Sequence, residues 1–390
     1  MQFKKIAKVI GIILVFGTIL AFIFVPAVIE KGMNVVDAHD PYPISEQAQA
    51  LHNSLVIGDW HADSALWMRD LAEESSYGQV DIPRMQKGNQ AIQMFTVVTK
   101  APTGLNYDEN DASSADNITR LAVLQRWPIS TWKSLTARAI FQAKKISELA
   151  ERDTDNFKLI LSKTDLANFF QARETNTTLT AGLIGTEGSH ALDGNLENIQ
   201  VLFDHGFRMM SLQHFFDNKL GGSLHGKSHA GLTDFGRQAL EKMQALSIII
   251  DVSHSSEKVV EDVLALNTTP LVVSHTGFKG HCDSPRNIRD DLMQSIAAKG
   301  GLIGVGYWEG AICGNHPSDI AKTIMYGIKL VGSEHVSLGS DFDGSVTTAI
   351  DSSELAAITQ SLLDLGATQT EISLVMGGNM KRFLEENLPD

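Results

Sequence analysis

Five short segments of this chain each combine a strand-like apolar run with a final residue that can bind a metal or move a proton. They are 56–63 (VIGDWHAD), 181–187 (AGLIGTE), 248–254 (IIIDVSH), 271–275 (LVVSH) and 336–341 (VSLGSD). Continuous Val, Ile and Leu runs are typical of parallel strands that are buried on both faces. In a β/α barrel, catalytic groups lie where such strands end, at the C-terminal face. We therefore expect one site assembled from His61, Asp63, Glu187, His254, His275 and Asp341.

Candidate strands alternate with amphipathic stretches along most of the chain. The strands are expected at 55–59, 91–98, 181–186, 208–212, 247–252, 270–274, 301–305 and 336–339, and helices at 233–246, 255–266, 288–299 and 321–331. Thr233 and Ser255 are candidate helix N-caps. The alternation predicts an α/β fold of the (β/α)8 TIM type. A doubly wound open sheet is less favoured, because the first strand runs into residues 60–63 rather than into a glycine-rich phosphate turn.

The first thirty residues differ in composition from the rest. Lys4, Lys5 and Lys8 precede an apolar run from residue 9 to residue 29, and roughly 20 apolar residues suffice to span a bilayer core. We expect a transmembrane helix in 1–30, a linker in 31–50 and the catalytic barrel in 51–390. By the positive-inside tendency, the barrel of this single-pass protein would face the extracytoplasmic side. A cleaved signal segment, which would make the protein secreted, is the alternative.

The composition narrows the class of protein further. With 43% hydrophobic and 20% charged residues, the chain is typical of a folded globular protein. Its net charge of −14 argues against nucleic-acid binding, which needs basic surfaces. Two cysteines, Cys282 and Cys313, are too few to define a disulfide framework, and we expect unpaired thiols. The long segment 101–152 follows the second strand and is expected to cover the site.

The residue types in the predicted site favour a pair of metal ions. His61 and Asp63 are two apart in an extended segment, so their side chains point to the same side. The Glu187 carboxylate has two oxygens and can bridge two metals, while His254 and His275 offer imidazole nitrogens, which suit zinc. One metal would be held by the first two residues and Glu187, and the second by Glu187 and the two later histidines. Two such metals can share a hydroxide that is nucleophilic at neutral pH.

A general base is also expected at the end of the last strand. The motif at 339–344 (GSDFDG) offers Asp341 and Asp343, and we assign the proton transfer to Asp341, which is nearer the strand end. Asp343 is expected to shape the turn. Each residue also has a simpler explanation, since Asp63 could cap a helix, Glu187 could lie in a loop and a single histidine could be structural. The joint pattern favours a catalytic metal site.

These residues lie in segments that resemble the membrane dipeptidase (renal dipeptidase) family of metallopeptidases, within the amidohydrolase-type barrels. The resemblance runs from about residue 55 to residue 383 and includes 58–67 (GDWHADSALW), 184–190 (IGTEGSH), 212–223 (LQHFFDNKLGGS), 272–287 (VVSHTGFKGHCDSPRN) and 377–383 (GGNMKRF). It implies hydrolysis of dipeptides with two Zn²⁺ ions per chain bridged by Glu187. It also implies acceptance of a D-residue at the C-terminal side of the dipeptide, and a homodimer.

The resemblance also implies residues that contact the substrate. His214 would stabilise the oxyanion, Arg286 would bind the C-terminal carboxylate of the dipeptide, and Tyr307 is a candidate for the same carboxylate. The chain departs from the family pattern at 215–220 and 306–310, which are expected to face the substrate. Hydrolysis of another small amide or ester on the same dinuclear barrel is therefore the alternative function. A catalytically silent binding module is less favoured, because all six metal-binding and proton-transfer positions are present.

Overall fold

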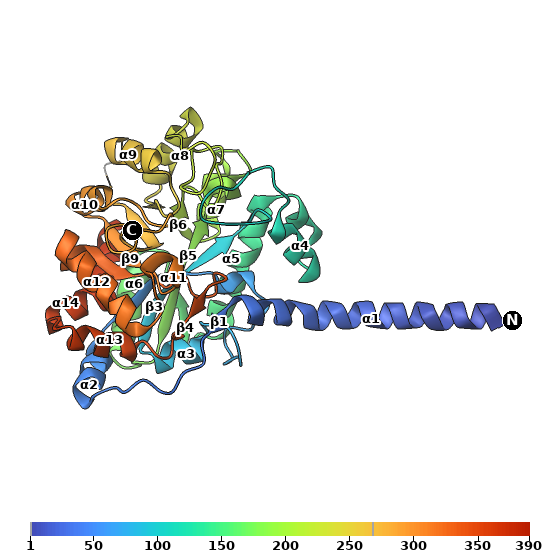
Figure 1. Cartoon of the computed structure of the whole chain (residues 1–390), viewed down its shortest axis with the longest axis horizontal. Helices are drawn as coiled ribbons and strands as arrows, with labels where there is room; N and C mark the ends of the chain where they lie inside the picture. The colour runs from blue at the N-terminus through green and yellow to red at the C-terminus, as the bar shows by residue number, and fades with distance from the viewer. Residues whose placement is uncertain (1, 267–268) are drawn as a thin grey trace.

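The computed structural model of the chain describes residues 2–266 and 269–390. Within these ranges, parallel strands form a closed barrel in the order β3-β2-β10-β9-β8-β7-β6-β5, and β5 pairs back to β3 (Figure 1). Their bounds are β2 (Ile57–Ala62), β3 (Gln90–Val98), β5 (Thr180–Glu187), β6 (Phe207–Ser211), β7 (Ile249–Asp251), β8 (Val272–Thr276), β9 (Leu302–Val305) and β10 (Val336–Leu338). Every strand overlaps its predicted range, and the predicted TIM-type barrel is confirmed.

The strands are read correctly from the sequence because both of their faces are buried. In β3 and β5, for example, every residue is buried. Because neither face of such a strand meets solvent, apolar and polar residues do not alternate, and apolar runs result. One short strand that extends the barrel sheet was not expected. β4 (Phe157–Leu159) pairs only with the beginning of β5, and its Phe-Lys-Leu sequence is too short to stand out.

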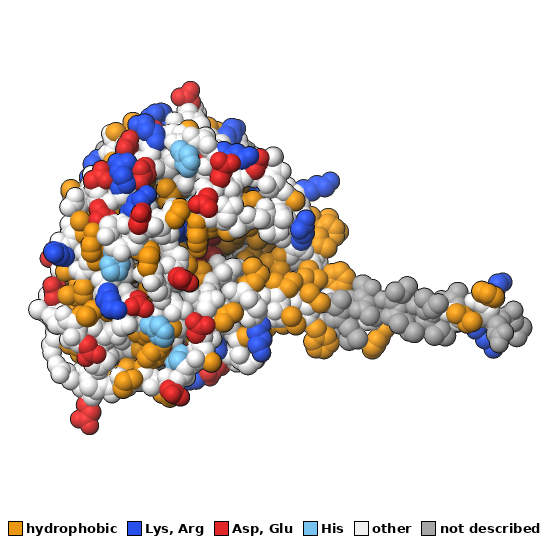
Figure 2. All heavy atoms as spheres, in the orientation of Figure 1, with side chains coloured by type: hydrophobic (Ala, Val, Ile, Leu, Met, Phe, Trp, Pro, Cys, Tyr) orange, Lys and Arg blue, Asp and Glu red, His pale blue; other side chains and the backbone are white. Residues whose placement is uncertain are grey.

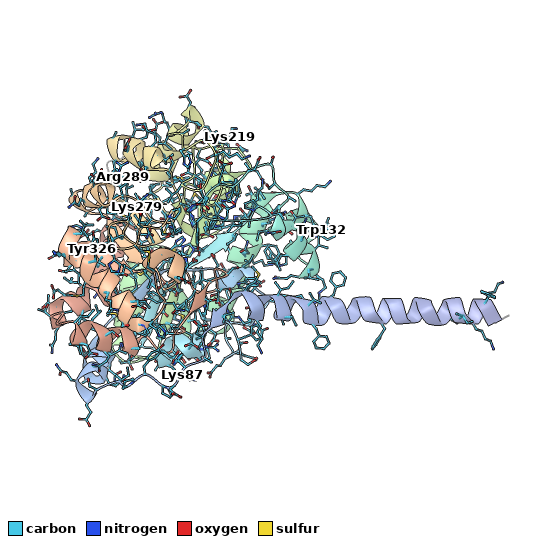
Figure 3. The ribbon with its side chains drawn as sticks, viewed as in Figure 1. Lys87, Trp132, Lys219, Lys279, Arg289 and Tyr326 are labelled. Atoms are coloured by element: carbon cyan, nitrogen blue, oxygen red, sulfur yellow. A yellow bond between two sulfur atoms is a disulfide. The ribbon has the colours of Figure 1, made fainter. Side chains whose placement is uncertain are left out.

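Helices surround the barrel, as Figure 1 shows. They are α2 (Glu46–Ser54), α3 (Ile82–Lys87), α4 (Asn117–Leu124), α5 (Leu135–Arg152), α6 (Lys163–Arg173), α7 (Asn198–Asp204), α8 (Asp234–Ala245), α9 (Glu257–Leu266), α10 (Asp290–Ala298), α11 (Glu309–Ile312), α12 (Pro317–Val331), α13 (Ala356–Asp364), α14 (Gln369–Ser373) and α15 (Asn379–Asn387). Neighbouring helices are also joined by polar contacts. The hydroxyl of Tyr326 on α12 donates a hydrogen bond to Asp290 on α10 (2.6 Å; Tyr326 is labelled in Figure 3).

Side-chain caps begin two of the predicted helices. At α8, the Thr233 hydroxyl accepts a hydrogen bond from the backbone N–H three residues later (3.0 Å), as predicted. At α9, the hydroxyl that accepts is that of Ser256, from the N–H of Val259 (3.1 Å), so the prediction of Ser255 is wrong by one residue. The Ser255 hydroxyl instead donates to the side-chain oxygen of Gln213 (2.6 Å).

The N-terminal helix α1 (Gln2–Met33) extends away from the barrel, and its last turns reach the body (Figure 1). In the part of the chain that the structure describes, none of the helices combines the length and the apolar character that crossing a bilayer requires. The predicted transmembrane helix, and the membrane anchoring built on it, are therefore not supported. The predicted linker 31–50 contains strand β1 (Val35–Val36), which pairs in parallel with β11 (Thr347–Thr348). The division into domains stays a prediction.

The segment 101–152 lies partly over the C-terminal ends of the barrel strands. It contains α4 and α5, and a buried arginine on α5 connects the two helices. Arg138 donates to the side chain of Asp116 and to the backbone oxygen of Thr99, both at 2.6 Å. Trp132, on the outer side of this segment, is 38% exposed (Figure 3).

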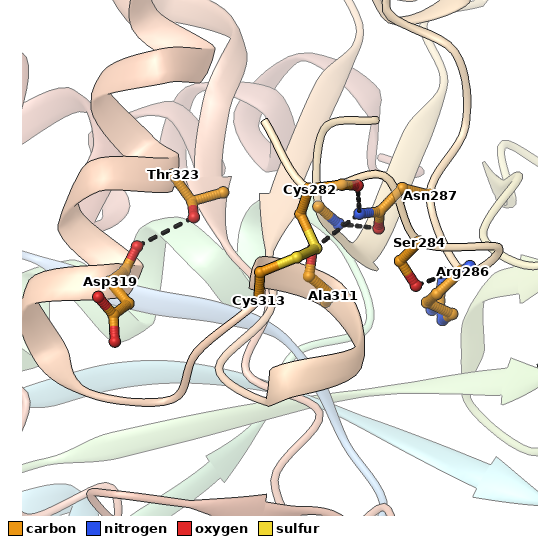
Figure 4. The surroundings of a disulfide bond; sticks show 9 residues. Cys282, Ser284, Arg286, Asn287, Ala311, Cys313, Asp319 and Thr323 are labelled. Carbon is orange, nitrogen blue, oxygen red and sulfur yellow. Dashed lines mark hydrogen bonds between the residues drawn. A yellow bond between two sulfur atoms is a disulfide. The ribbon is translucent and has the colours of Figure 1, made fainter. Parts of the chain in front are cut away.

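Cys282 and Cys313 form a disulfide, so the expectation of two unpaired thiols is wrong (Figure 4). The bond joins the loop after β8 to the end of α11. Asn287 lies beside it and donates to the backbone oxygens of Cys282 (2.9 Å) and Ala311 (2.8 Å). The two cysteines lie 31 residues apart in the sequence, and the neighbouring positions of β8 and β9 bring their loops together.

Candidate active site

The predicted metal-binding residues converge on the Glu187 carboxylate at the end of β5. Its Oε1 atom lies 3.5 Å from Nε2 of His61, 3.3 Å from Nε2 of His254 and 3.5 Å from Nε2 of His275. All four residues are buried. The strands that carry them are separated in the chain but meet at one end of the barrel, as the apolar runs predicted.

Asp63 completes this cluster. Its Oδ1 lies 3.6 Å from Nε2 of His61 and accepts a hydrogen bond from the hydroxyl of Thr96 on β3 (2.6 Å). Asp63 precedes the 3-10 helix Ser64–Leu66, yet its side chain makes no capping hydrogen bond there. The simpler explanation of Asp63 as a helix cap therefore does not apply.

The donor atoms form overlapping groups of a kind that can hold a divalent ion. His61, Asp63 and Glu187 form one group, and Glu187, His254 and His275 form another, with the donor atoms of each group within 4.8 Å of one another. These are the two sets expected from the sequence, and Glu187 belongs to both. A further group joins His61 and His275 with Asp341.

The charges in the cluster fit bound cations. Burial opposes a charge on His61, but Asp63, Glu187 and Asp341 together raise the pKa of its imidazole to about 10. Burial raises the pKa of the Glu187 carboxyl well above its usual value, and Asp63 adds to this. The carboxylates here repel one another. A bound divalent ion would neutralise their negative charge and would displace a proton from His61.

The geometry of the imidazoles fits bound cations as well. The Nε2 atoms of His254 and His275 lie only 3.0 Å apart. Burial lowers the pKa of both rings, so both imidazoles are neutral. The Nε2 atom of each ring can then offer a lone pair to a metal ion. Nε2 of His61 is buried without a hydrogen-bond partner among the described residues. Three imidazole nitrogens and two carboxylates form a donor set of the kind that zinc prefers.

One serine hydroxyl orients two of these imidazoles. Ser274 Oγ donates to Asp251 Oδ2 (2.7 Å) and lies 3.1 Å from Nδ1 of His61 and 2.9 Å from Nδ1 of His275. Because a hydroxyl has one proton and two acceptor lone pairs, the oxygen is left to accept from both Nδ1–H groups. Both Nε2 atoms are then free to bind a metal on the side of Glu187.

Asp341 and Asp343 have different environments. The Asp341 carboxylate faces the cluster, 3.8 Å from Nε2 of His61, and burial raises its pKa to about 7. Asp343 is fully buried and accepts from Arg69 Nη2 (2.6 Å), the Ser64 hydroxyl (2.5 Å) and a backbone N–H. Asp343 is thus committed to holding the loop together, which agrees with the role expected for it.

Left-handed backbone conformations gather at the strand ends. The φ angles are +62° at His254, +61° at Asp341 and +60° at Asp343. Non-glycine residues adopt this region infrequently, and strained residues are concentrated at functional sites.

Two of the three residues expected to contact the substrate lie beside the cluster. Nε2 of His214, after β6, is 3.2 Å from Glu187 Oε2, and burial lowers the pKa of its imidazole to about 4. Arg286 is 1% exposed and donates from Nη2 to the backbone oxygen of His275 (2.8 Å). Its Nη1 has no hydrogen-bond partner among the described residues.

Tyr307 is not brought to the site. Its side chain is fully buried, and its ring packs edge-on against Phe342 (5.4 Å between centroids), so it does not line the active-site cavity. The next residue, Trp308, lines the cavity instead and donates from Nε1 to the hydroxyl of Tyr107 (2.8 Å). Of these two neighbours, the structure thus brings Trp308, and not Tyr307, to the cavity.

The cluster opens into a cavity of about 470 Å³, which is rich in apolar side chains. Phe215 lies in 215–220, one of the segments expected to face the substrate, and Tyr107 lies in the segment expected to cover the site, although neither residue is singled out by the sequence. Near them, the buried imidazole of His225 lies 5.3 Å from the ring of His254, measured between centroids. Other walls come from α1, the 3-10 helix after β2, α4 and the loop after β10, and they include Ile29, Met33, Leu66, Trp67, Ile118, Leu121, Leu124 and Val346.

Comparison with known proteins agrees with this fold. The family model described as membrane dipeptidase, peptidase family M19, matches residues 45–388. Dipeptidase aclJ of Aspergillus oryzae is 26% identical over 350 residues, covering 84% of this chain and 77% of that protein. Dipeptidase 3 of mouse is 26% identical over 364 residues, covering 88% of this chain and 66% of the mouse protein.

Among solved structures, a metallopeptidase from Rhodobacter sphaeroides, liganded with a phosphinate mimic of the dipeptide L-Ala-D-Ala, shares the fold. Its TM-score is 0.65 at 20% identity, and the match covers 85% of this chain and 99% of that one. The family match extends over nearly the whole barrel and includes every strand that contributes to the cluster. The chain therefore belongs to the membrane dipeptidase family of metallopeptidases, peptidase family M19.

Proposed function

We propose that this dipeptidase-family enzyme hydrolyses dipeptides with two divalent ions, most suitably Zn²⁺, that share the Glu187 carboxylate. His61 and Asp63 would hold one ion, and His254 and His275 the other. The observation that carries the proposal is the approach of three imidazole Nε2 atoms to the same Glu187 oxygen, at 3.3–3.5 Å. When bound, such a pair of ions lowers the pKa of a water molecule and polarises the peptide carbonyl.

Asp341 is proposed to accept a proton from the attacking water and to pass it to the leaving amine. Burial raises the pKa of this carboxyl to about 7, which is near the pH at which a group can both take and release a proton. Its carboxylate faces His61 and lines the cavity, so it lies beside the reacting carbonyl. Asp343 has no free oxygen for this task, since both of its oxygens already accept hydrogen bonds.

His214 and Arg286 are proposed to hold the substrate. The imidazole of His214 is neutral because burial lowers its pKa, and one ring nitrogen can donate a proton to the carbonyl oxygen as negative charge develops. Arg286 has an Nη1 group without a partner among the described residues, and it lines the cavity. A guanidinium in this position can bind the C-terminal carboxylate of a dipeptide.

The stereochemistry at the C-terminal residue is a finer proposal. The related metallopeptidase of R. sphaeroides has been solved with a mimic of L-Ala-D-Ala. We infer that this enzyme also accepts a D-residue at the C-terminal side.

Metal analysis and a dipeptide panel test the proposal together. We expect two zinc ions per purified chain and turnover of both L-Ala-L-Ala and L-Ala-D-Ala. A Glu187→Gln variant should lose both ions together, because it removes the shared ligand, whereas Asp341→Asn should keep the ions and lose turnover. Fewer than two bound ions together with no dipeptide hydrolysis would refute the proposed function. Turnover of simple amides or esters in place of dipeptides would favour the alternative hydrolase.

A further inference from the structure

The inner end of helix α1 forms part of the active-site cavity. Ile29 and Met33 line the cavity together with Ile118 and Leu121 of α4. Ile29 also packs against the buried cluster that contains Trp67, whereas Met33 is 43% exposed at the rim. Figure 2 shows hydrophobic side chains gathered around the hollow where α1 meets the body. One wall of the cavity therefore comes from outside the barrel.

This end of α1 is fixed to the barrel by buried polar contacts. Glu30 is 1% exposed and forms an ion pair with Arg69, which also binds Asp343 of the loop after β10 (2.6 Å). Next along the chain, the side-chain oxygen of Asn34 accepts from the backbone N–H of Ser345 (2.9 Å). Strand β1 then pairs with β11 in the same loop. These contacts thus fix the apolar wall relative to the loop after β10, which carries the proposed base.

Arg286 lies against the ring of Trp308 (5.4 Å to the centroid), whereas the wall from α1 belongs to the buried cluster that contains Trp67. Arg286 is on the side of His254 and His275, since its Nη2 lies 3.3 Å from the first ring and 2.8 Å from the backbone oxygen of the second. The wall from α1 adjoins the segment after Asp63, because Ile29 packs in one cluster with Leu66 and Trp67, which lie three and four residues after Asp63. If Arg286 holds the C-terminal carboxylate, the N-terminal residue of the dipeptide faces the apolar wall.

We propose that this wall is a subsite for a large apolar side chain on the N-terminal residue of the substrate, and that Ile29 and Met33 of α1 determine this specificity. The inference rests on the proposed dipeptide hydrolysis and names its substrate class. A cavity of about 470 Å³ has room for a Leu or Phe side chain beside the reacting backbone. The apolar walls would lower the free energy of the bound apolar side chain by removing its surface from water.

The test compares two dipeptide series in the full-length, zinc-loaded enzyme. In the first series, L-X-L-Ala, the N-terminal residue is Ala, Leu, Phe or Lys, and in the second, L-Ala-L-X, the same residues are placed at the C-terminal side. We expect kcat/KM of the wild type to rise from Ala to Leu and Phe in the first series. In the double variant Ile29→Ser with Met33→Ser, the ratio of kcat/KM for Phe-Ala to that for Ala-Ala should fall about tenfold, as for the loss of a few apolar contacts.

Val28→Ser is the matched control. Val28 lies on the same turn of α1 and is 69% exposed, and it is not part of the cavity lining, so its ratio should equal that of the wild type. An unchanged ratio in the double variant would overturn the inference, as would a preference for apolar residues that appears only in the Ala-X series. Equal loss in the double variant and in Val28→Ser would also overturn it, because the effect would then be general to α1.

Failure of the proposed function gives a different result. If the wild type hydrolyses no dipeptide at all, the cavity is tested directly by binding of 1-anilinonaphthalene-8-sulfonate, which has apolar rings and an anionic group. Weaker binding by the double variant than by Val28→Ser and the wild type would support the apolar subsite. Equal binding by all three proteins would refute it.

Discussion

The disulfide between Cys282 and Cys313 should contribute mainly to stability, and its removal in a Cys282→Ser/Cys313→Ser variant tests this. The bond closes a loop with a sequence separation of 31 residues. In the chain-entropy model such a loop restricts the unfolded chain by about 12 cal/mol/K, which is about 4 kcal/mol at 25 °C. For 390 residues, the unfolding entropy is about 0.8 kcal/mol/K, so Tm should fall by about 4–5 °C.

The active site should be affected much less than the stability. Asn287 holds the same loop independently, because its side-chain oxygen accepts from the N–H of Gly277 (2.8 Å) and its amide donates to the backbone oxygen of Ala311 (2.8 Å). Arg286, which directly precedes Asn287, should therefore keep its position. KM for a dipeptide should then change little below the melting range.

Differential scanning calorimetry with and without a reductant measures the effect. Reductant should lower Tm of the wild type to that of the double variant and should leave the variant unchanged. A fall in Tm of less than about 1 °C would show that the loop is already ordered in the unfolded ensemble, contrary to the entropy argument. A large rise in KM at unchanged Tm would show instead that the bond positions Arg286.

Further outcomes are expected at single residues. Ser274→Ala should weaken zinc binding by about 10–100-fold at both positions, measured by competition with a chelator, because one hydroxyl orients two ligand imidazoles, whereas Ser274→Thr should restore it. Asp341→Asn should reduce kcat by about 10²–10⁴-fold with both zinc ions retained, and retention of kcat would exclude Asp341 as the base. Burial raises the pKa of Glu30 to about 7. The neutral carboxyl therefore contributes to the free energy of unfolding below pH 4.5, and this contribution is lost as the pH rises through 7. Glu30→Gln should therefore melt close to the wild type at pH 5 and above it at pH 8, and a constant difference in Tm would contradict this.

The barrel and its metal-binding cluster follow from local sequence because both depend on the same signal. A parallel strand buried on both faces needs an apolar run, and the residue after the run lies at the C-terminal face. This rule predicts the positions of His275 and Glu187 at the site. Even so, Ser255 was predicted where Ser256 caps α9, since two adjacent hydroxyls are equally able to cap and the tertiary contact with Gln213 decides between them.

The remaining features depend on contacts between distant segments, for which the sequence has no local pattern. The contacts from Glu30 through Arg69 to Asp343 join three distant parts of the chain, and a buried ion pair has no periodic signature. Hydropathy reports only the apolar run in residues 1–30, and it gives no information on these tertiary contacts. The resemblance to the family points to Tyr307, although Trp308 is the residue that lines the cavity.

The pairing of β2 with β10, through Asp59 and Leu338, joins the first long strand of the barrel to its last. His61 and Asp341 lie on either side of this junction, so the proposed proton acceptor joins the metal-binding cluster only when the C-terminal strand has been synthesised and inserted. A truncation that removes β10 should produce an inert protein rather than a slower enzyme.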